Sequence, residues 1–424
     1  MLIEQRNSLR GEISVPGDRS ISHRAIMFGA LAKGITEIEG FSMGEDCLNT
    51  IECFRKMQIG VEILQNNKVR ISGKGIYGLK PPPSVLNTGK SGTTIRLLLG
   101  ILSGQPFNSI VIREDSAQKK PVGKAVKPLR LMGAAIAGKE DGNLCPLHIS
   151  PSKLKSITYE LPVSDTQIKS PILIAGLYAD GDTTVIEAAK SRDHSELMMN
   201  YFGAKIRVDG LKATSHRVDN LYAQHVEIPG DISIASFFIT AALLTSNSDI
   251  TIKNVGINPT RTGILDVYKS MGAKIEIMNE RTVSNEMVAD IRVLSSSLVA
   301  SEIEVEMIPR LIDEIPVIAV AAAIAKGTTT IKGLKNFRVK ESIRIKSLTT
   351  ELTKMGASVH ETEDGMAIVG GKPLKGTVIE SYGDSAIAMA MSVAGLIADG
   401  ETMIRKTQVV DIVYPDFFKT LNSI

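Results

Sequence analysis

The chain contains 424 residues, of which 43% are hydrophobic and 22% are charged, and its formal net charge is +3. These values exclude a disordered chain and favour two folded domains, because one core rarely extends over so many residues. No block of like charges indicates a nucleic-acid surface, and the longest apolar run, Ile315–Ala325, is too short to cross a bilayer. We therefore expect neither nucleic acid nor a membrane as a partner.

The cysteines and histidines indicate a cytoplasmic protein without a metal. Residues 1–13 lack the basic-then-apolar pattern of a secretion signal. Cys47, Cys53 and Cys145 are odd in number and lack metal-ligand spacing, which is typical of a reducing compartment. The six histidines show no paired spacing either, so we expect no metal and no organic cofactor.

Taken in chain order, six similar segments each run from the end of an apolar helix, through a turn, into a β-rich strand. They lie at residues 30–40, 100–112, 175–188, 241–254, 321–333 and 394–406. The turns fall at nearly even spacing, at Gly34, Gly104, Gly181, Asn247, Gly327 and Gly400. Such a period indicates one α/β unit repeated six times.

A second phrase, LMGAAI at residues 131–136, ends a polar-faced helix and begins a strand, and similar phrases begin at Met57, Tyr201, Ser270 and Lys354. The six helices of the first phrase have no polar face, which predicts burial on all sides. The alternating helices, such as residues 47–57 and 263–271, carry charges on one face and should be solvated. Short β-branched segments, such as residues 304–307 and 328–333, should form sheets outside the buried helices.

The repeats predict an α/β fold of two pseudo-threefold domains, each with three βαβ-type units, helices inside and strands outside. The sequence Pro-Gly-Asp recurs at residues 16–18 and 229–231, where we expect the chain to cross between domains. The expected domains are residues 15–228, and residues 1–14 together with 229–424, with the active site in the cleft between them.

The loops before the six apolar helices are rich in Ser, Thr, Asp and Gly, at residues 17–24, 88–96, 164–170, 230–236, 310–316 and 382–390. Ordinary helix capping explains any one of them. If the units are symmetric, however, the helix N-termini gather at one end of each domain, where exposed N–H groups attract anions. Both interpretations remain open for each loop, and together the six loops favour a site for small anionic ligands.

Charged side chains near these loops support an anion site, namely Arg19, Arg24, Lys90, Arg96, Lys119, Lys120, Lys169, Arg338, Lys340 and Arg344. Two acids lie among them: Asp313 in the cap of a buried helix, and Glu341 between Lys340 and Arg344. Carboxylates among cations at an anion site are candidates for general acid–base catalysis, although plain ion pairing is the alternative.

Eight ordered motifs resemble those of the 5-enolpyruvylshikimate-3-phosphate synthase family along essentially the whole chain: VPGDRSISHRA, GKSGTTIRLL, DTQIKSPILIAGL, SRDHSE, PGDIS, NPTRTG, LIDEIP and FRVKESIRI. The resemblance implies the two-domain enolpyruvyl transferase fold, small anionic substrates and no cofactor. It also implies transfer of the enolpyruvyl group of phosphoenolpyruvate to a ring hydroxyl of shikimate 3-phosphate, by addition and then elimination with release of phosphate. We expect a monomer.

The resemblance implies a role for each residue that stands at a site position of the family. Asp313 would take the hydroxyl proton, Glu341 would protonate the methylene carbon, and Arg19 stands at the position of a catalytic lysine. The acceptor substrate would be bound by Ser20, Arg24, Asp165, Thr166, Gln167, Ser191, Asn336 and Lys340. Phosphoenolpyruvate would be bound by Lys90, Gly92, Lys120 and Arg344.

Several site positions depart from the family pattern, namely Arg19, Lys90, Lys120, Asp165, Ile234, Ile343, Ser385, Ala386 and Asp411. Ala386 and Asp411 replace an arginine and a lysine, which removes positive charge expected near phosphoenolpyruvate. Two alternatives follow from these changes. One is a diverged paralogue that acts on another cyclic acid, for example an unphosphorylated one, without enolpyruvyl transfer, and the other is a non-catalytic binding protein.

Overall fold

The described residues contain six small sheets and six buried apolar helices. The computed structural model describes residues 1–334 and 339–424, and the side chains of residue 115 and residues 339–343 lie outside this description. The chain forms two units: unit 1 consists of Met1–Pro16, Pro229–Arg281 and Met287–Ile424, and unit 2 consists of Gly17–Ile228 and Thr282–Glu286.

Unit 2 contains three sheets. The strand order of the first is β14 (Leu221–Tyr222), β3 (Ala32–Glu39), β5 (Lys68–Lys74) and β4 (Gly60–Leu64), with β15 (His225–Glu227) also on β3. The second is β6 (Leu86–Asn87), β7 (Ser109–Ile112), β9 (Leu144–Ser150) and β8 (Ala135–Gly138). The third is β10 (Thr158–Glu160), β11 (Thr183–Ile186), β13 (Lys212–Ser215) and β12 (Arg207–Asp209).

Unit 1 also contains three sheets. The first is β1 (Leu2–Ile3), β24 (Thr402–Arg405) and β23 (Val378–Glu380). The second is β17 (Lys274–Val283), β18 (Glu286–Leu294), β16 (Asp249–Gly256) and β2 (Arg10–Ser14). The third is β19 (Glu302–Ile303), β20 (Thr328–Ile331), β22 (Met366–Val369) and β21 (Ser358–Glu361).

The sheets share one pairing pattern, which explains the sequence repeat. In each sheet a short strand lies parallel to the strand that follows an apolar helix, as β6 does to β7 and β19 does to β20. The next pairings within the sheet are antiparallel, as in β7–β9 and β20–β22. Parallel neighbours require a crossover connection, and in the pairs β6–β7, β10–β11, β19–β20 and β23–β24 the apolar helix between the two strands supplies it.

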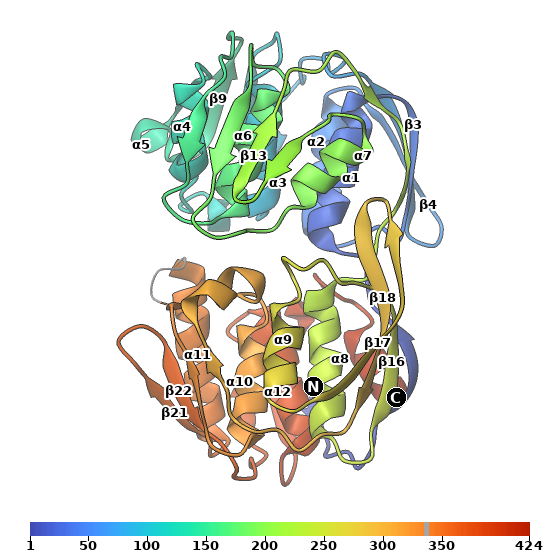
Figure 1. Cartoon of the computed structure of the whole chain (residues 1–424), viewed down its shortest axis with the longest axis vertical. Helices are drawn as coiled ribbons and strands as arrows, with labels where there is room; N and C mark the ends of the chain where they lie inside the picture. The colour runs from blue at the N-terminus through green and yellow to red at the C-terminus, as the bar shows by residue number, and fades with distance from the viewer. Residues whose placement is uncertain (335–338) are drawn as a thin grey trace. The chain divides into compact units, whose positions relative to one another are not determined.

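Those apolar helices form the interior of each unit, as their composition predicts (Figure 1). They are α1 (Arg19–Leu31), α3 (Gly92–Leu102) and α6 (Thr166–Gly176) in unit 2, and α8 (Ile232–Leu244), α10 (Ile315–Ile324) and α12 (Ser385–Ile397) in unit 1. Helix α10 contacts both α8 and α12, and α3 packs along α6. At Gly100 of α3 an added Cβ would lie 2.6 Å from the Pro171 carbonyl oxygen of α6, so only glycine permits this approach. Within the described residues, no helix combines the length and apolar character needed to cross a membrane.

The remaining helices are α2 (Glu45–Lys56), α4 (Gly123–Leu131), α5 (Lys139–Gly142), α7 (His194–Tyr201), α9 (Gly263–Ser270), α11 (Val339–Lys354) and α13 (Phe417–Ser423). Helices α2 and α9 bury one apolar face and expose charges on the other, as their sequences predict. The strand predicted at residues 304–307 is wrong: the strand ends at Ile303, and Val305–Arg310 is a 3₁₀ helix. Pro309 has no N–H group to donate to a sheet at that point.

The turn glycines occupy the left-handed backbone region at most repeats. Gly34, Gly181, Gly327 and Gly400 have φ between 87° and 109°. Gly104 instead makes room for a side chain, because an added Cβ would lie 2.2 Å from Cγ of Tyr178. In the second phrase, Gly133 has a φ of 93°, whereas the equivalent residue of the first repeat is Gln58, with a φ of 64°.

Gln58 therefore holds a conformation that costs a residue with a side chain about 1–2 kcal/mol. We expect Gln58→Gly to raise the free energy of unfolding by about 1 kcal/mol, since the added flexibility of glycine in the unfolded chain offsets part of the relief. Chemical denaturation with urea measures it. The reverse change Gly272→Gln is the matched control, since Gly272 has a φ of 83° and open space around its Cα. It should lower the free energy of unfolding. Equal free energies of unfolding for both variants and the wild type would contradict this explanation.

Candidate active site

Acidic and hydroxyl side chains cap the buried helices. Asp18, Ser91, Asp165, Asp231 and Asp384 each accept a hydrogen bond from a backbone N–H in the first turn of α1, α3, α6, α8 and α12. Ordinary capping is thus confirmed for five of the six loops, and α10 has Glu314 at its N-cap without such a bond. Four of these caps are carboxylates, which offset the positive end of the helix dipole. Anion binding near these helices must therefore come mainly from Arg and Lys side chains.

The N-termini of α1 and α3 lie together in unit 2. His23 of α1 shares a hydrogen bond of 2.8 Å with Thr50, and Thr50 shares one of 2.8 Å with Thr94 in the first turn of α3. The Thr94 hydroxyl donates to the capping Ser91, also over 2.8 Å. Burial, and then the neighbouring Arg24, lower the pKa of His23 to about 3, so its ring is neutral at physiological pH.

Arg24 joins α1 to α6 and α7. Its Nε donates to the Ser195 hydroxyl over 2.7 Å, its Nη2 to the Ser170 hydroxyl over 3.1 Å, and its Nη1 to the Ser20 carbonyl over 2.9 Å. The side chain is only 3% exposed, and burial lowers its pKa to about 10, so it stays charged. Within the described chain, all three of these acceptors are neutral oxygens. These three hydrogen bonds therefore leave the charge of Arg24 without a carboxylate partner.

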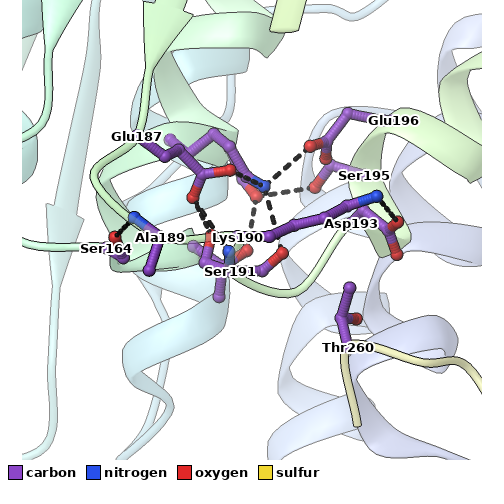
Figure 2. A network of polar contacts seen from close by, with 12 residues as sticks. Ser164, Glu187, Ala189, Lys190, Ser191, Asp193, Ser195, Glu196 and Thr260 are labelled. Carbon is purple, nitrogen blue, oxygen red and sulfur yellow. Dashed lines mark hydrogen bonds and ion pairs between the residues drawn. The ribbon is translucent and has the colours of Figure 1, made fainter. Parts of the chain in front are cut away.

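Lys169 of α6 differs from the prediction of a cation facing the anion site. It is fully buried, and its Nζ lies 2.9 Å from Glu187 and 2.8 Å from Glu196. Burial opposes its charge, but the two carboxylates outweigh burial and raise the pKa of Lys169. Figure 2 shows Glu187 and Glu196 converging on this interior position from the loop after β11 and from α7. Lys169 is thus part of a structural ion-pair network.

Ser191 is attached to the same network. Its N–H donates to Glu187 over 3.2 Å, and its hydroxyl donates to the same carboxylate oxygen (Figure 2). Nearby, the Ala189 N–H donates to the Ser164 hydroxyl over 2.8 Å. The loop that carries Ser191 therefore lies against the start of α6, where Asp165, Thr166 and Gln167 follow Ser164.

The other predicted residues of unit 2 lie on the same helix starts or on the surface. Arg19 and Ser20 open α1 and are half-buried, and Gly92 opens α3. Thr166 and Gln167 are half-buried in the first turn of α6, and Asp165 caps it through the Gln167 N–H over 2.9 Å. Lys90 is exposed and lies 3.6 Å from Glu114, and Lys120 is exposed.

In unit 1 the starts of α8 and α10 meet around buried charges. Ser233 of α8 donates its hydroxyl to Glu314, and Arg261 donates to Asp231 over 3.1 Å and to the Ser233 hydroxyl over 2.8 Å. Asp313 is half-buried and immediately precedes this network. The prediction that Asp313 itself caps α10 is wrong, because the N-cap residue is Glu314. The sequence motif NPTRTG contained Arg261 but gave no reason to pair it with the α8 cap.

Arg344 of α11 pairs with the cap of α12. Its Nε donates to Asp384 over 2.9 Å, and the other Asp384 oxygen accepts the Ala386 N–H over 2.8 Å. Asp411 is exposed after the last 3₁₀ helix, Thr407–Val409. Asn336 lies outside the described residues, as do the side chains of Lys340 and Glu341.

Comparison with known proteins places this arrangement in a family. The model of the family described as EPSP synthase (3-phosphoshikimate 1-carboxyvinyltransferase) matches residues 3–421. The chain belongs to the EPSP synthase family. Its predicted fold class is confirmed by a solved EPSP synthase structure from Acinetobacter baumannii, with a TM-score of 0.92 and 41% identity, over 100% of this chain and 97% of that one.

Relatives of the same family match over their whole length. A 3-phosphoshikimate 1-carboxyvinyltransferase from Thermoanaerobacter sp. (strain X514) is 52% identical over 422 residues, which cover 100% of this chain and 99% of the relative. One of the same name from Desulforamulus reducens is 50% identical over 424 residues, again 100% of this chain and 99% of the relative. Membership in the EPSP synthase family, stated above as a resemblance, is confirmed.

The neutral state of His23 has a consequence for acid stability. Because the unfolded chain binds a proton at an ordinary histidine pKa and the folded chain does so only near pH 3, stability is full above about pH 6.5 and falls as the pH drops toward 3. His23→Asn should make this decline shallower by up to about 1.4 kcal/mol per pH unit. Urea denaturation between pH 7 and 4 measures the slope. His148→Asn, an exposed control on β9, should leave the slope unchanged, and equal slopes for all three proteins would contradict a neutral His23.

Proposed function

We propose that the chain is a 3-phosphoshikimate 1-carboxyvinyltransferase, which moves the enolpyruvyl group of phosphoenolpyruvate to a ring hydroxyl of shikimate 3-phosphate and releases phosphate. The observation that carries this proposal is the 52% identity, over the whole chain, to a relative of that name. Membership of the EPSP synthase family makes the protein an enzyme with small anionic substrates.

The reaction needs one proton acceptor and one proton donor in its addition step. In the proposed roles, Asp313 takes the proton from the attacking hydroxyl, and Glu341 gives a proton to the methylene carbon. The hydroxyl oxygen bonds to the central carbon of phosphoenolpyruvate and forms a tetrahedral intermediate. In the elimination step the carbon–oxygen bond to phosphate breaks, and the methyl group loses a proton to restore the double bond.

Binding of the two substrates is assigned to cationic and hydroxyl side chains. We propose that Arg24, with Ser20, Thr166, Gln167 and Ser191, binds shikimate 3-phosphate, joined by Asp165, Asn336 and Lys340. Support comes from Arg24, whose buried charge meets only neutral oxygens in the described chain. Phosphoenolpyruvate is assigned to Lys90, Gly92, Lys120 and Arg344, with Arg19 near the reacting groups. Arg344 is oriented by Asp384, although that carboxylate also reduces its net charge.

The two alternative functions gain no support from the comparisons. Full-length relatives that are about half identical to this chain carry the carboxyvinyltransferase name, whereas neither a different acceptor nor a binding-only role is suggested by any of them. The departures at Asp165, Ala386 and Asp411 therefore count as differences in detail within the family.

We also propose that the protein works as a cytoplasmic monomer with the predicted domains, residues 15–228 and residues 1–14 plus 229–424. The three cysteines support a reducing compartment, because all are free. Light scattering during size-exclusion chromatography measures the mass, for which the monomer value is 45.6 kDa.

Phosphate release tests the function directly. Purified protein given both shikimate 3-phosphate and phosphoenolpyruvate should release phosphate at a rate within tenfold of about 10 per second, a typical enzyme turnover. Asp313→Asn and Glu341→Gln should each lower kcat by about 10²–10⁴-fold, because each removes a proton-transfer group. Asp249→Asn weakens a half-buried ion pair with Arg292 on unit 1 and serves as the control with unchanged kcat.

Each outcome decides between the functions. Absence of phosphate release with shikimate 3-phosphate, together with turnover of an unphosphorylated cyclic acid, would establish the diverged paralogue instead. Absence of turnover with either acceptor, despite saturable binding in calorimetry, would establish the binding protein.

A further inference from the structure

The buried ion-pair network of Lys169, Glu187 and Glu196 has no role in the proposed reaction, yet it adjoins the proposed acceptor site of unit 2. Lys169 lies one turn into α6, Glu187 follows β11, and Glu196 belongs to α7. All three side chains are nearly inaccessible, with exposures of 0%, 6% and 3%. Burying three charges costs free energy of desolvation, so the network has one of two explanations. Either its geometry positions other residues, or it only forms part of the folded core. The contacts of its neighbours distinguish these cases.

The first neighbour is Ser191. Glu187 receives both the N–H and the hydroxyl of Ser191, and Lys169 donates to the Ser191 carbonyl over 3.4 Å. Lys169 therefore contacts Ser191 directly and also fixes the carboxylate that orients it. This clamp holds the Ser191 loop against α6, whose first turn carries Thr166 and Gln167.

The second neighbour is Arg24. The Ser195 hydroxyl accepts from Arg24 and donates to the Ser170 hydroxyl over 2.7 Å, and Ser170 also accepts from Arg24. Ser195 precedes Glu196, and Ser170 follows Lys169, so this triangle shares its backbone with the ion pair. Glu196 is the carboxylate whose charge acts most strongly on Arg24, yet in the described chain its only ion pair is with Lys169.

We propose that Lys169 is a positioning residue of the acceptor site: it binds Glu187 and Glu196, which fixes Ser191 and leaves the guanidinium of Arg24 available to the substrate anion. This inference rests on the proposed function. Without the Lys169 ammonium, two buried carboxylates lose their counter-charge, and Arg24 is the nearby cation to which Glu196 can turn. An Arg24–Glu196 pair would weaken attraction for an anionic acceptor, and a released Glu187 would no longer hold Ser191.

Steady-state kinetics of Lys169→Met, with each substrate varied in turn, test the proposal. We expect the KM for shikimate 3-phosphate to rise at least about tenfold, since removing one member of a buried charge pair strongly weakens the binding that the pair supports. The KM for phosphoenolpyruvate should change by less than roughly twofold, because Lys169 contacts none of the groups assigned to that substrate. Calorimetric binding of shikimate 3-phosphate alone should weaken in parallel.

Two further variants separate positioning from stability. Lys169→Arg keeps the charge and should recover part of the acceptor KM. The double variant Lys169→Met/Glu196→Gln removes the carboxylate that competes for Arg24, so its acceptor KM should be lower than that of Lys169→Met. If Lys169→Met does not fold, as judged by circular dichroism, the comparison of Lys169→Arg and the double variant with the wild type carries the test. Lys253→Met, which breaks the ion pair of Lys253 with Asp290 at 2.6 Å in unit 1, is the control with an unchanged acceptor KM.

The outcomes for the two proposals are distinct. A wild-type protein without phosphate release overturns the proposed function, and the inference falls with it. A wild type that turns over, with folded Lys169 variants whose acceptor KM is unchanged or whose two KM values rise equally, overturns the positioning role alone. A lower melting temperature with unchanged kinetics would likewise show that the network only stabilises the fold.

Discussion

The need to enclose apolar helices on every side governs this protein. Helix α10 carries no charged or polar side chain between Ile315 and Ile324, so exposure of any of its faces to water would be unfavourable. Helices α8, α11 and α12 cover part of its surface, and strand β22 also contacts it. The same requirement applies to α3 and α6, which approach closely enough at Gly100 and Pro171 to exclude any side chain there. In each unit, three apolar helices and three sheets together meet this requirement for burial.

Enclosure leaves only the ends of these helices for chemistry. Their N-terminal turns carry the hydroxyl, acidic and basic residues, and their interiors carry almost none. Because carboxylates cap most of the N-termini, the local charge balance depends on which basic side chains are neutralised and which are not. Lys169 is neutralised by two carboxylates, whereas Arg24 meets hydroxyls and a carbonyl. Two cations on neighbouring helices thus differ in what they can offer a ligand.

The periodic sequence predicted the fold because burial and turn geometry act locally. Apolar helices, β-rich strands and turn glycines repeat together, so the number of units and the inside–outside arrangement could be derived before any contact was known. Pairings between distant residues could not. Nothing near Lys169 in the sequence distinguishes it from a site-facing cation, because its partners Glu187 and Glu196 belong to other elements. Likewise, the backbone angles are needed to show that Gln58 occupies the position that a glycine holds in the other repeats.

The pairing of the two chain ends has a consequence for the order of folding during synthesis. Strand β1 at Leu2 pairs with β24 at Met403, and the terminal ammonium of Met1 donates to the Ile404 carbonyl over 2.9 Å. Strand β2 must likewise wait for β16 at Asp249. Unit 2 can complete its sheets once β15 leaves the ribosome, whereas β1 stays unpaired until β24 has been synthesised. Strand β1 can therefore pair only after all the strands of unit 2 have been synthesised.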